Sequence, residues 1–215
     1  YGRPLRRERR KLLENRLPDM QIEIPPEGCL DPVGLFDPPV QEVWLEIGSG
    51  NGKHAIWQAE HNPAVGLVAV EPFINGVANL VSLADRKDLN NVKVLADDAR
   101  LLLARLKPGS IARSFILFPD PWPKRRHWRR RIVCPEVLDQ LALAMPSGAE
   151  LRVGTDHADY LVWILRVLRN HPGFRWEPKG ADDWRCRPVD WPETRFEAKG
   201  WEAGRASTYL SLRRV

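Results

Sequence analysis

Five short apolar runs, each followed by a segment with helical character, most constrain the fold of this 215-residue chain. The runs are VWLEI (43–47), LVAVE (67–71), VKVLA (92–96), FILF (115–118) and ELRVGT (150–155). Short apolar runs bounded by glycine or polar residues are typical of strands buried on both faces. Helices are expected over 53–61, 75–87, 99–106, 135–145 and 160–170, and a late strand over 207–213. This alternation predicts an α/β fold, with a doubly wound, mostly parallel sheet and helices on both faces.

The length and composition fit one domain preceded by a basic arm. A hydrophobic share of 43% is enough for a core. Residues 1–40 are expected to be an arm or frayed helix followed by an irregular lead-in rich in proline and turn signals, and residues 41–215 to form the domain. The Trp- and Pro-rich stretch 176–203 is expected to be loose. Because the chain begins at Tyr1 rather than Met, a piece upstream of it is also expected.

Several classes of protein are not favoured by this sequence. No segment approaches the roughly 20 apolar residues of a membrane span, and the N-terminus is too charged for a secretory signal. Three widely spaced cysteines (Cys29, Cys134 and Cys186) form neither a disulfide framework nor a metal site. The five histidines have no metal-ligand spacing and are expected at the surface or at helix caps. We therefore expect a protein of the reducing cytoplasm, with no membrane association and no metal.

The positive charge is concentrated in two patches. The chain holds 33 Lys and Arg against 28 Asp and Glu, for a formal net charge of +5. Residues 1–16 carry a net charge of +5, and so do residues 118–131, so the rest of the chain is mildly acidic at −5. Local patches of this kind predict a docking surface for a polyanion, although a charge run can also be no more than a solvated face.

The second patch includes the most distinctive motif, FPDPWPKRRHWRRR (118–131). Asp120 follows an apolar strand and sits among three prolines and a tryptophan, so a carboxylate is held at a strand end, where chemistry can occur. Six of the next eight residues from Lys124 onward are Lys or Arg, which predicts a grip on phosphates, with Trp128 a candidate platform for base stacking. The motif indicates an enzyme that acts on nucleic acid. The plainer alternative is that Asp120 is only a turn residue before Pro121.

A glycine-rich loop and two carboxylates predict a nucleoside-type cofactor. In EIGSGNG (46–52), Gly48, Gly50 and Gly52 allow a tight turn and close approach of a ligand, with a spacing that differs from the dinucleotide-binding pattern. Glu71 ends the next strand, where a carboxylate can accept hydrogen bonds from both ribose hydroxyls. Asp98 follows the third strand and can accept a hydrogen bond from an adenine amine.

The position of Glu46 narrows the choice of cofactor further. A carboxylate at the glycine loop would repel a pyrophosphate but attract an α-amine or a sulfonium, which fits S-adenosylmethionine and does not fit NAD. Each acidic residue taken alone could instead be a helix cap. Several such positions fall at or just past predicted strand ends, which argues for a shared cleft: Glu46, Gly48, Glu71, Asp98, Asp120 and Asp156.

On these motifs the sequence resembles the bacterial tRNA (guanine-N7-)-methyltransferases, over nearly the whole chain from Leu45 onward. The motifs are EIGSGNG (46–52), Glu71, Asp98-Ala99, FPDPWPKRRH (118–127), GTD (154–156) and TRFE (194–197). The resemblance implies a class I methyltransferase of Rossmann-like fold, with a seven-stranded sheet in which the last strands pair antiparallel. It also implies S-adenosylmethionine as cofactor and tRNA as partner, with no obligate protein partner.

The resemblance assigns roles to particular positions. It implies that Asp120 is the active-site residue and that the basic N-terminal segment is used on tRNA. Residues around Trp128 and within 72–80 look individual to this chain, which leaves the finer tRNA contacts open. The expected cofactor contacts are Glu46, Gly48, Gly50, Gly52, Glu71, Asp98 and Asp120. The expected substrate contacts are Lys124, Arg126, Asp156, Thr194, Arg195, Phe196 and Glu197.

The chemistry of the implied reaction agrees with the motif. Guanine N7 has an in-plane lone pair and no proton, so the enzyme needs alignment with the methyl donor more than a strong base. We expect Asp120 to stabilise the cationic base or to accept hydrogen bonds from guanine N1–H and N2–H₂, with Asp156 and Glu197 as further candidates for the base edge. The family's target is the guanine of the tRNA variable loop. For TRFE, a structural turn with an internal ion pair remains the alternative.

Two other functions remain open from the sequence. One is a class I methyltransferase that acts on protein or on a small molecule, which the basic patches disfavour. The other is a non-catalytic RNA-binding module on a methyltransferase fold. The intact acidic series disfavours this second alternative.

Overall fold

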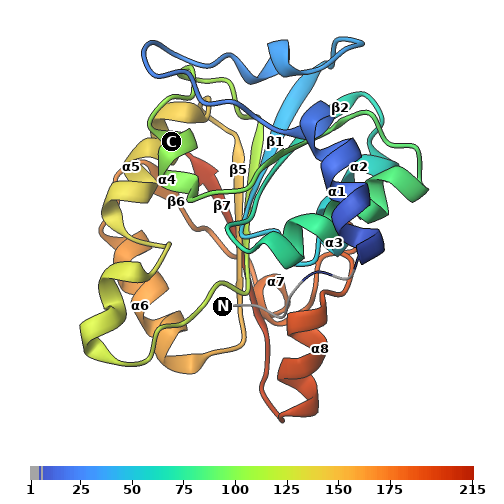
Figure 1. The fold of residues 1–215 in the computed structure, drawn as a ribbon. Helices are drawn as coiled ribbons and strands as arrows, with labels where there is room; N and C mark the ends of the chain where they lie inside the picture. Colours follow the sequence, from blue (N-terminus) through green and yellow to red (C-terminus); the bar gives the residue numbers. More distant parts are fainter. Residues whose placement is uncertain (1–4, 6) are drawn as a thin grey trace.

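The computed structural model, which describes residue 5 and residues 7–215, is built on one seven-stranded sheet (Figure 1). The strands are β1 (Glu42–Ile47), β2 (Val65–Val70), β3 (Val92–Leu95), β4 (Arg113–Leu117), β5 (Glu150–Thr155), β6 (Phe174–Arg175) and β7 (Thr208–Arg214). Their order in the sheet is β3-β2-β1-β4-β5-β7-β6. The pairs from β3 to β5 are parallel, whereas β7 runs antiparallel to both β5 and β6. The predicted fold class is confirmed, and each predicted strand lies within two residues of its observed bounds.

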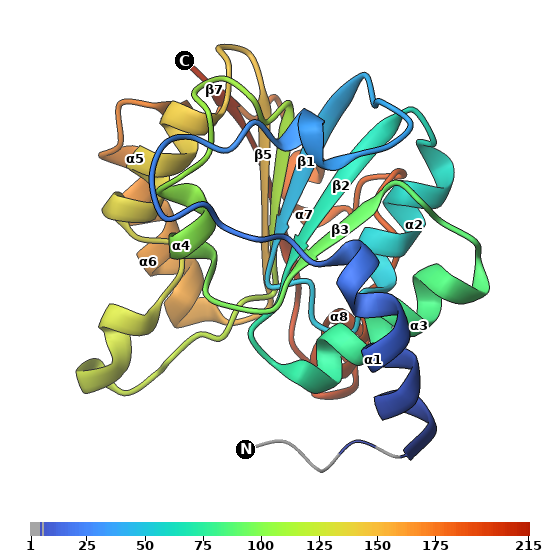
Figure 2. The same cartoon turned by 45° about the horizontal axis from the view of Figure 1, so that its top comes forward.

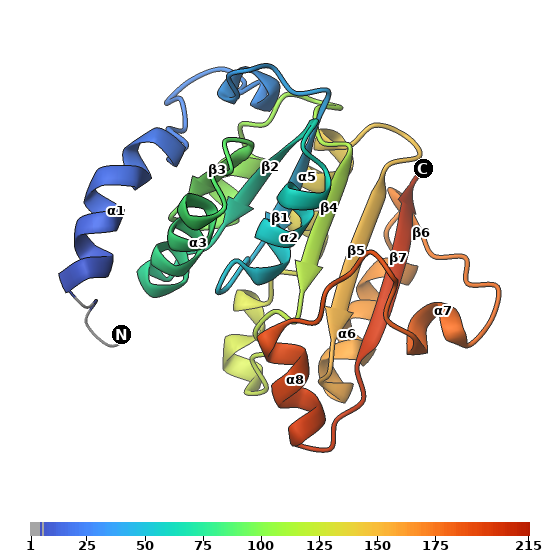
Figure 3. The ribbon, with the colours of Figure 1, turned by 90° about the vertical axis from the view of Figure 1, so that its right-hand side faces the viewer.

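Helices cover both faces of the sheet (Figure 3). The helices α1 (Arg7–Met20), α2 (Lys53–His61) and α3 (Ile74–Arg86) share one hydrophobic core with one face of the strands. The helices α4 (Ala99–Leu103), α5 (Pro135–Ala144) and α6 (Ala158–Arg169) share a second core with the other face. Successive side chains of a strand point to opposite faces, so Val43 and Leu45 belong to the second core and Trp44 to the first.

The N-terminal part is more regular than predicted. Helix α1 continues to Met20, into the stretch expected to be irregular, and it packs along α3 (Figure 2). The Arg16 guanidinium lies 2.8 Å from the Asp85 carboxylate of α3, and a bridge between Gln21 and Val94 joins the end of α1 to β3. The 3-10 helix η1 (Pro32–Leu35) interrupts the rest of the lead-in. Residues 1–4 and 6 of the predicted arm lie outside the described residues.

The prediction that residues 176–203 are loose holds only in part. This stretch contains α7 (Asp182–Arg185) and α8 (Arg195–Glu202). Helix α8 begins with a capping box, in which the Thr194 hydroxyl accepts from the Glu197 N–H and the Glu197 carboxylate accepts from the Thr194 N–H. The spacing T-x-x-E is a recognised signal for a helix start, but the Trp and Pro content around it obscured that signal.

The cationic run forms the 3-10 helix η2 (Arg125–Arg130). No helix in the described part of the chain is long and apolar enough to cross a membrane.

Candidate active site

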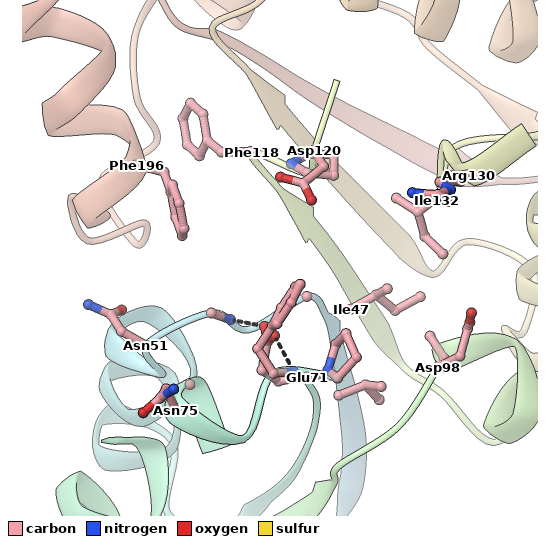
Figure 4. A pocket seen from close by; sticks show the side chains of 18 of the residues that line it. Ile47, Asn51, Glu71, Asn75, Asp98, Phe118, Asp120, Arg130, Ile132 and Phe196 are labelled. Carbon is pink, nitrogen blue, oxygen red and sulfur yellow. Dashed lines mark hydrogen bonds between the residues drawn. The ribbon is translucent and has the colours of Figure 1, made fainter. Parts of the chain in front are cut away.

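A cavity of about 920 Å³ opens at the carboxyl ends of β1, β2 and β4 (Figure 4). In open α/β sheets, ligands bind at this edge. The loops that follow the strands supply one wall, η2 supplies the rim beside Asp120, and α8 covers the glycine loop. The lining includes Ile47, Gly48, Gly50, Glu71, Phe73, Asp98, Phe118, Asp120, Trp122, Arg129, Arg130, Arg195, Phe196 and Lys199.

The glycine loop is seated directly on α3. Gly48, Gly50 and Gly52 all have positive φ (76°, 57° and 77°), a region that side chains with a Cβ rarely adopt. A Cβ on Gly52 would lie 2.6 Å from the Leu80 Cβ, and a Cβ on Gly76 of α3 would lie 2.3 Å from the Gly50 carbonyl oxygen. Gly48 and Gly50 line the cavity, as predicted for a cofactor loop, whereas Gly52 holds the loop against α3.

Glu71 is fixed at the cavity wall by two backbone donors. Its two carboxylate oxygens accept from the Gly50 N–H at 2.7 Å and the Phe73 N–H at 2.9 Å (Figure 4). Burial raises the pKa of Glu71 above its ordinary value; the two N–H donors lower it, and the Asp120 and Glu46 carboxylates raise it further. A carboxylate has about four acceptor positions, so Glu71 keeps the capacity to accept two further hydrogen bonds.

Asp98 combines the two roles that the sequence left open. It caps α4, accepting from the Arg100 N–H at 2.9 Å, and its other oxygen lies 3.1 Å from the Arg100 guanidinium. The same residue lines the cavity. Its carboxylate is half exposed, so capping does not withdraw it from a ligand.

Asp120 lies on the cavity wall in a strained turn (Figure 4). Phe118 and Trp122, two residues before and after it, both have positive φ (51° and 42°), which is uncommon for aromatic residues. The Phe118 N–H donates to the Gly154 carbonyl of β5 at 2.8 Å, which fixes the start of the turn. The Asp120 side chain is exposed, and no described residue donates a hydrogen bond to it. Strain of this kind is characteristic of functional sites.

Glu46 does not line the cavity, contrary to the expectation that it faces the cationic part of a cofactor. It points to the α2–α3 side of the sheet, is 2% exposed, and its carboxylate lies 2.8 Å from Nδ1 of His54. The His54 Nε2 in turn lies 3.1 Å from the Gln58 amide, which donates to the Asp190 carbonyl. The prediction that all histidines are surface or cap residues is therefore wrong for His54, and it is also wrong for His171, which is 8% exposed. His54 links Glu46, before the glycine loop, to the first turn of α2, which follows that loop.

Asp156 and Glu197 are occupied by contacts within the protein. The Asp156 carboxylate accepts from the Arg205 guanidinium at 2.8 Å. Glu197 is fully buried, accepts from the Tyr209 hydroxyl, and lies 3.5 Å from the Arg187 guanidinium. The expectation that either carboxylate reaches the base edge from the cavity wall does not fit this arrangement, because neither lines the cavity.

The TRFE motif acts here as an anchor for α8, and it brings other residues to the site. With Thr194 and Glu197 holding the first turn of the helix, Arg195 and Phe196 reach the cavity together with Lys199. Phe196 lies over the glycine loop, because a Cβ on Gly50 would be 3.1 Å from its ring. Two of the four predicted substrate contacts in this motif thus face the cavity, and the other two position them.

The cationic side chains of residues 124–131 do not all point to solvent. Lys124, Arg126 and their neighbours Arg125, Arg129 and Arg130 are exposed, as a grip on phosphate requires. Arg131, predicted to be a phosphate contact, is 2% exposed. Trp128, predicted to be a stacking platform, is half-buried and packs 5.5 Å from the ring centroid of Trp163. Not all six cations of the run were expected to face the RNA, and Arg131 is the one that turns into the protein. A stacking role for Trp128 stays a prediction.

Sequence reasoning missed several lining residues. Phe73 and Trp122 present aromatic surface to the cavity, and Arg9 of α1 and Arg100 of α4 add positive charge. The Arg130 guanidinium stacks 4.8 Å from the Trp122 ring centroid. Trp122 had a signal in the sequence through its place in the motif at 118–131, and Arg9 through its place in the basic patch 1–16. Phe73 and Arg100 reach the cavity through packing that no local pattern reveals.

The lining fits S-adenosylmethionine. A carboxylate at the end of β2 with spare acceptor positions suits ribose hydroxyls, and the half-exposed Asp98 suits an adenine amine. The open backbone at Gly48 and Gly50 allows close approach of the ligand. Among residues 5 and 7–215, no group of three or more His, Cys, Asp or Glu could hold a metal ion.

Solved methyltransferase structures share this fold. The 16S rRNA methyltransferase KamB aligns with 81% of this chain and 88% of its own, at a TM-score of 0.59 and 19% identity. The aminoglycoside resistance methyltransferase NpmB1 aligns with 82% of this chain and 88% of its own, at a TM-score of 0.57 and 15% identity. At these identities the likeness shows the fold alone, which is that of class I methyltransferases.

Sequence relatives identify the family. The family described as "Putative methyltransferase" matches residues 40–210. A tRNA (guanine-N(7)-)-methyltransferase of Rhodospirillum rubrum is 46% identical over 99% of this chain and 85% of its own. One of Azorhizobium caulinodans is also 46% identical, over 100% of this chain and 92% of its own. The chain therefore belongs to the tRNA (guanine-N(7)-)-methyltransferase family.

Proposed function

We propose that this chain transfers a methyl group from S-adenosylmethionine to N7 of a guanine in tRNA, and that the guanine is the one in the variable loop. The observation that carries the proposal is the strained turn that holds Asp120 over a cavity also walled by Glu71 and Asp98. Names of relatives that span nearly the whole chain support the same reaction.

The cofactor is held mainly by the loops after β1, β2 and β3. Glu71 accepts hydrogen bonds from the ribose hydroxyls with the acceptor positions that Gly50 and Phe73 leave free. Asp98 accepts from the adenine amine while it caps α4. When bound, S-adenosylmethionine supplies an electrophilic methyl group on a sulfonium. Glu46 contributes through the glycine loop that it supports together with His54.

Asp120 orients and stabilises the base. Because guanine N7 carries a free lone pair, the protein must align the base rather than remove a proton from N7. The developing positive charge on the guanine ring is favoured by the Asp120 carboxylate, which is at the cavity wall and keeps its acceptors free of the described residues. The same carboxylate can accept from guanine N1–H and N2–H₂, an edge that adenine does not present.

The cations around the mouth bind the RNA backbone. They come from separate elements: Arg9 from α1, Arg129 and Arg130 from η2, and Arg195 and Lys199 from α8. Lys124, which directly precedes η2, and Arg126 within η2 are also exposed. Cations grouped at one opening favour a phosphate backbone that passes over it. The target base must leave its stack to reach the methyl donor.

We also propose that the enzyme works in the reducing cytoplasm and needs no protein partner. Cys29 and Cys186 are exposed and unpaired, which suits a reducing compartment.

The test is methyl transfer by the purified chain from labelled S-adenosylmethionine to unmodified tRNA, with identification of the product nucleoside. Label in 7-methylguanosine that disappears when the variable-loop guanine is replaced is the expected result. Label in 7-methylguanosine that survives this replacement would overturn the assigned position. Label in protein or in a small molecule would overturn the substrate, and cofactor binding without transfer to any RNA would favour the non-catalytic alternative.

A further inference from the structure

We propose that Arg131, the last cation of the basic run, is a positioning residue that clamps the turn carrying Asp120. It therefore affects the rate of methyl transfer rather than the binding of RNA. The inference rests on the proposed function, because the turn that it holds is the one proposed to carry the base-binding carboxylate. Arg131 follows a row of exposed cations and is itself 2% exposed.

An aromatic cage holds the Arg131 guanidinium. Its Cζ lies 4.7 Å from the ring centroid of Trp128, 4.9 Å from that of Trp163 and 5.1 Å from that of Tyr160. Ring faces attract a cation and hold its plane in place. The cage is tied to the chain that follows, because the Trp163 Nε1–H donates to the Val133 carbonyl at 2.8 Å and the Tyr160 hydroxyl accepts from the Val133 N–H at 3.3 Å.

From this cage, Arg131 donates to the two residues that follow Asp120. Its Nε–H donates to the Pro121 carbonyl at 2.9 Å, and its NH2 group donates to the Trp122 carbonyl at 3.4 Å. A planar guanidinium with several donors can bridge two adjacent carbonyls while its face lies against the rings, whereas the ammonium of lysine is a point charge without this planar arrangement of donors. Arg131 therefore holds the turn from its C-terminal side.

The turn needs such a clamp because its own composition leaves it few donors. Pro119, Pro121 and Pro123 have no N–H, so the segment cannot be held by a ladder of backbone hydrogen bonds. Its start is held by the bond from the Phe118 N–H to Gly154, and positive φ at Phe118 and Trp122 stores strain on both sides of Asp120. Backbone in this region persists only where the surroundings impose it. Arg131 supplies that constraint at the end of the turn.

Steady-state kinetics of Arg131→Met on tRNA are the first test, with Arg125→Met as the contrast. Arg125 is an exposed cation of the same run. Misplacement of a catalytic group by about 1 Å can cost about 100-fold in rate, so Arg131→Met is expected to lower kcat by that order while the KM for tRNA changes little. Arg125→Met is expected to do the reverse, raising KM at unchanged kcat. If Arg131→Met raised KM alone, Arg131 would be an RNA contact and the inference would be wrong.

A double-mutant cycle separates positioning from general damage to the fold. If Arg131 acts through Asp120, then Arg131→Met introduced into the Asp120→Asn enzyme should cost less than about 3-fold further in kcat. The same loss in both backgrounds would show that Arg131 only supports the structure. Should Arg131→Met fail to fold, Arg131→Lys keeps the charge in the cage, is expected to lose the bridge to the two carbonyls, and serves in the same cycle.

Hydrogen exchange tests the clamp without cofactor or tRNA. In the Arg131 variants, the Phe118 amide, which donates to the Gly154 carbonyl where the turn begins, should exchange faster than in the wild type, while the amides inside β4 and β5 keep their protection. Unchanged exchange at the Phe118 amide would overturn the inference. If the wild type did not methylate tRNA, the proposed function would fail, yet the exchange measurement would still decide whether Arg131 clamps the turn.

Discussion

At the scale of single residues, similar carboxylates in the glycine-loop and strand-end motifs have different tasks because their surroundings differ. Glu71 is buried and held by two backbone donors, whereas Asp120 is exposed on a strained turn. Glu46 is buried behind the glycine loop beside His54. The first therefore suits binding of neutral hydroxyl donors, the second suits a base that becomes charged, and the third supports the loop.

The role of Asp120 predicts a loss in turnover larger than the loss in cofactor binding. Asp120→Asn keeps the size of the side chain and removes its charge, and loss of one electrostatic contact to a transition state typically costs about 10²–10³-fold in kcat. Turnover on tRNA and cofactor affinity by calorimetry are the measurements. Near-full turnover with unchanged selectivity for guanine would refute this role.

The raised pKa of Glu71 predicts opposite pH dependences for two quantities: cofactor affinity, and the stability of the protein without cofactor. Burial raises the folded-state pKa of Glu71 above its ordinary value of 4.5. Its contribution to stability is therefore present below that ordinary value and is lost as pH rises through the folded-state pKa. The ionised form is the better acceptor for ribose hydroxyls, so cofactor affinity should rise over the same window.

Comparison with Glu71→Gln isolates this group. The free energy of unfolding of the wild type minus that of the variant should fall as pH rises above the ordinary value of 4.5, because the unfolded wild type releases the Glu71 proton at a lower pH than the folded protein does. Affinity for S-adenosylmethionine should rise with pH in the wild type and stay flat in the variant. Parallel pH profiles for the two proteins would show that another group governs the transition.

At the scale of elements, the site depends on how the glycine loop and α8 are seated. The loop lies against α3 without room for a Cβ at Gly52, and α8 lies over the loop through Phe196. Helix α8 is fixed at its start by the capping box of Thr194 and Glu197 and by the hydrogen bond from Tyr209. Both elements bring residues to the cavity. The positions of these residues depend on this packing rather than on their neighbours in the sequence.

Gly52→Ala should destabilise the protein and weaken cofactor binding together. The left-handed conformation costs a residue with a Cβ about 1–2 kcal/mol, and overpacking against Leu80 adds about 1–3 kcal/mol. Denaturant unfolding and cofactor titration are the measurements. Gly34→Ala is the matched control, because a Cβ on Gly34 would have no neighbour within 4 Å and its φ is not positive, so we expect it to be near neutral. Equal effects of the two substitutions would contradict the close seating of the loop.

Thr194→Ala should cost about 1 kcal/mol of stability, which is typical of a lost N-cap, and should raise the KM for tRNA. The reason for the second effect is that Arg195, Phe196 and Lys199 line the cavity from the helix that Thr194 starts. Thermal unfolding and steady-state kinetics are the measurements. Thr194→Ser keeps the capping hydroxyl and should restore both properties. If Thr194→Ala lowered stability but left KM unchanged, α8 would have no part in substrate binding.

At the scale of the whole molecule, positive charge from distant parts of the sequence surrounds one opening. Arg9 of α1, Arg130 of η2 and Lys199 of α8 all line the same cavity, while the chain outside the two basic patches is mildly acidic. The fold thus converts two separate basic runs and one helix into a single surface for a polyanion.

This arrangement predicts a steep dependence of tRNA affinity on salt. If about four phosphates are neutralised, the logarithm of the association constant should fall with a slope of about 3 against the logarithm of salt concentration. Arg125→Gln should reduce the slope by about 1, whereas Arg131→Lys should leave it unchanged because Arg131 is buried. Binding curves at several salt concentrations are the measurement, and a flat dependence would refute the docking surface.

The sequence by itself determined the sheet, the glycine loop and the order of the acidic positions. Buried parallel strands are read from continuous apolar runs, and a tight loop from its glycines, because both depend on neighbours in the chain. The same local signals placed Gly48, Glu71, Asp98 and Asp120 at one edge of the sheet, where the structure brings them to one cavity.

Only the tertiary structure decided which way individual side chains face. A central strand is apolar on both faces, so its sequence does not say that Glu46 points to α2 and His54 rather than to the cavity. A run of cations does not reveal that Arg131 meets an aromatic cage partly built by α6, a helix that begins more than 25 residues later in the chain. The physical reason is the same in both cases: burial, hydrogen bonds and ring contacts depend on neighbours that packing brings from distant parts of the sequence.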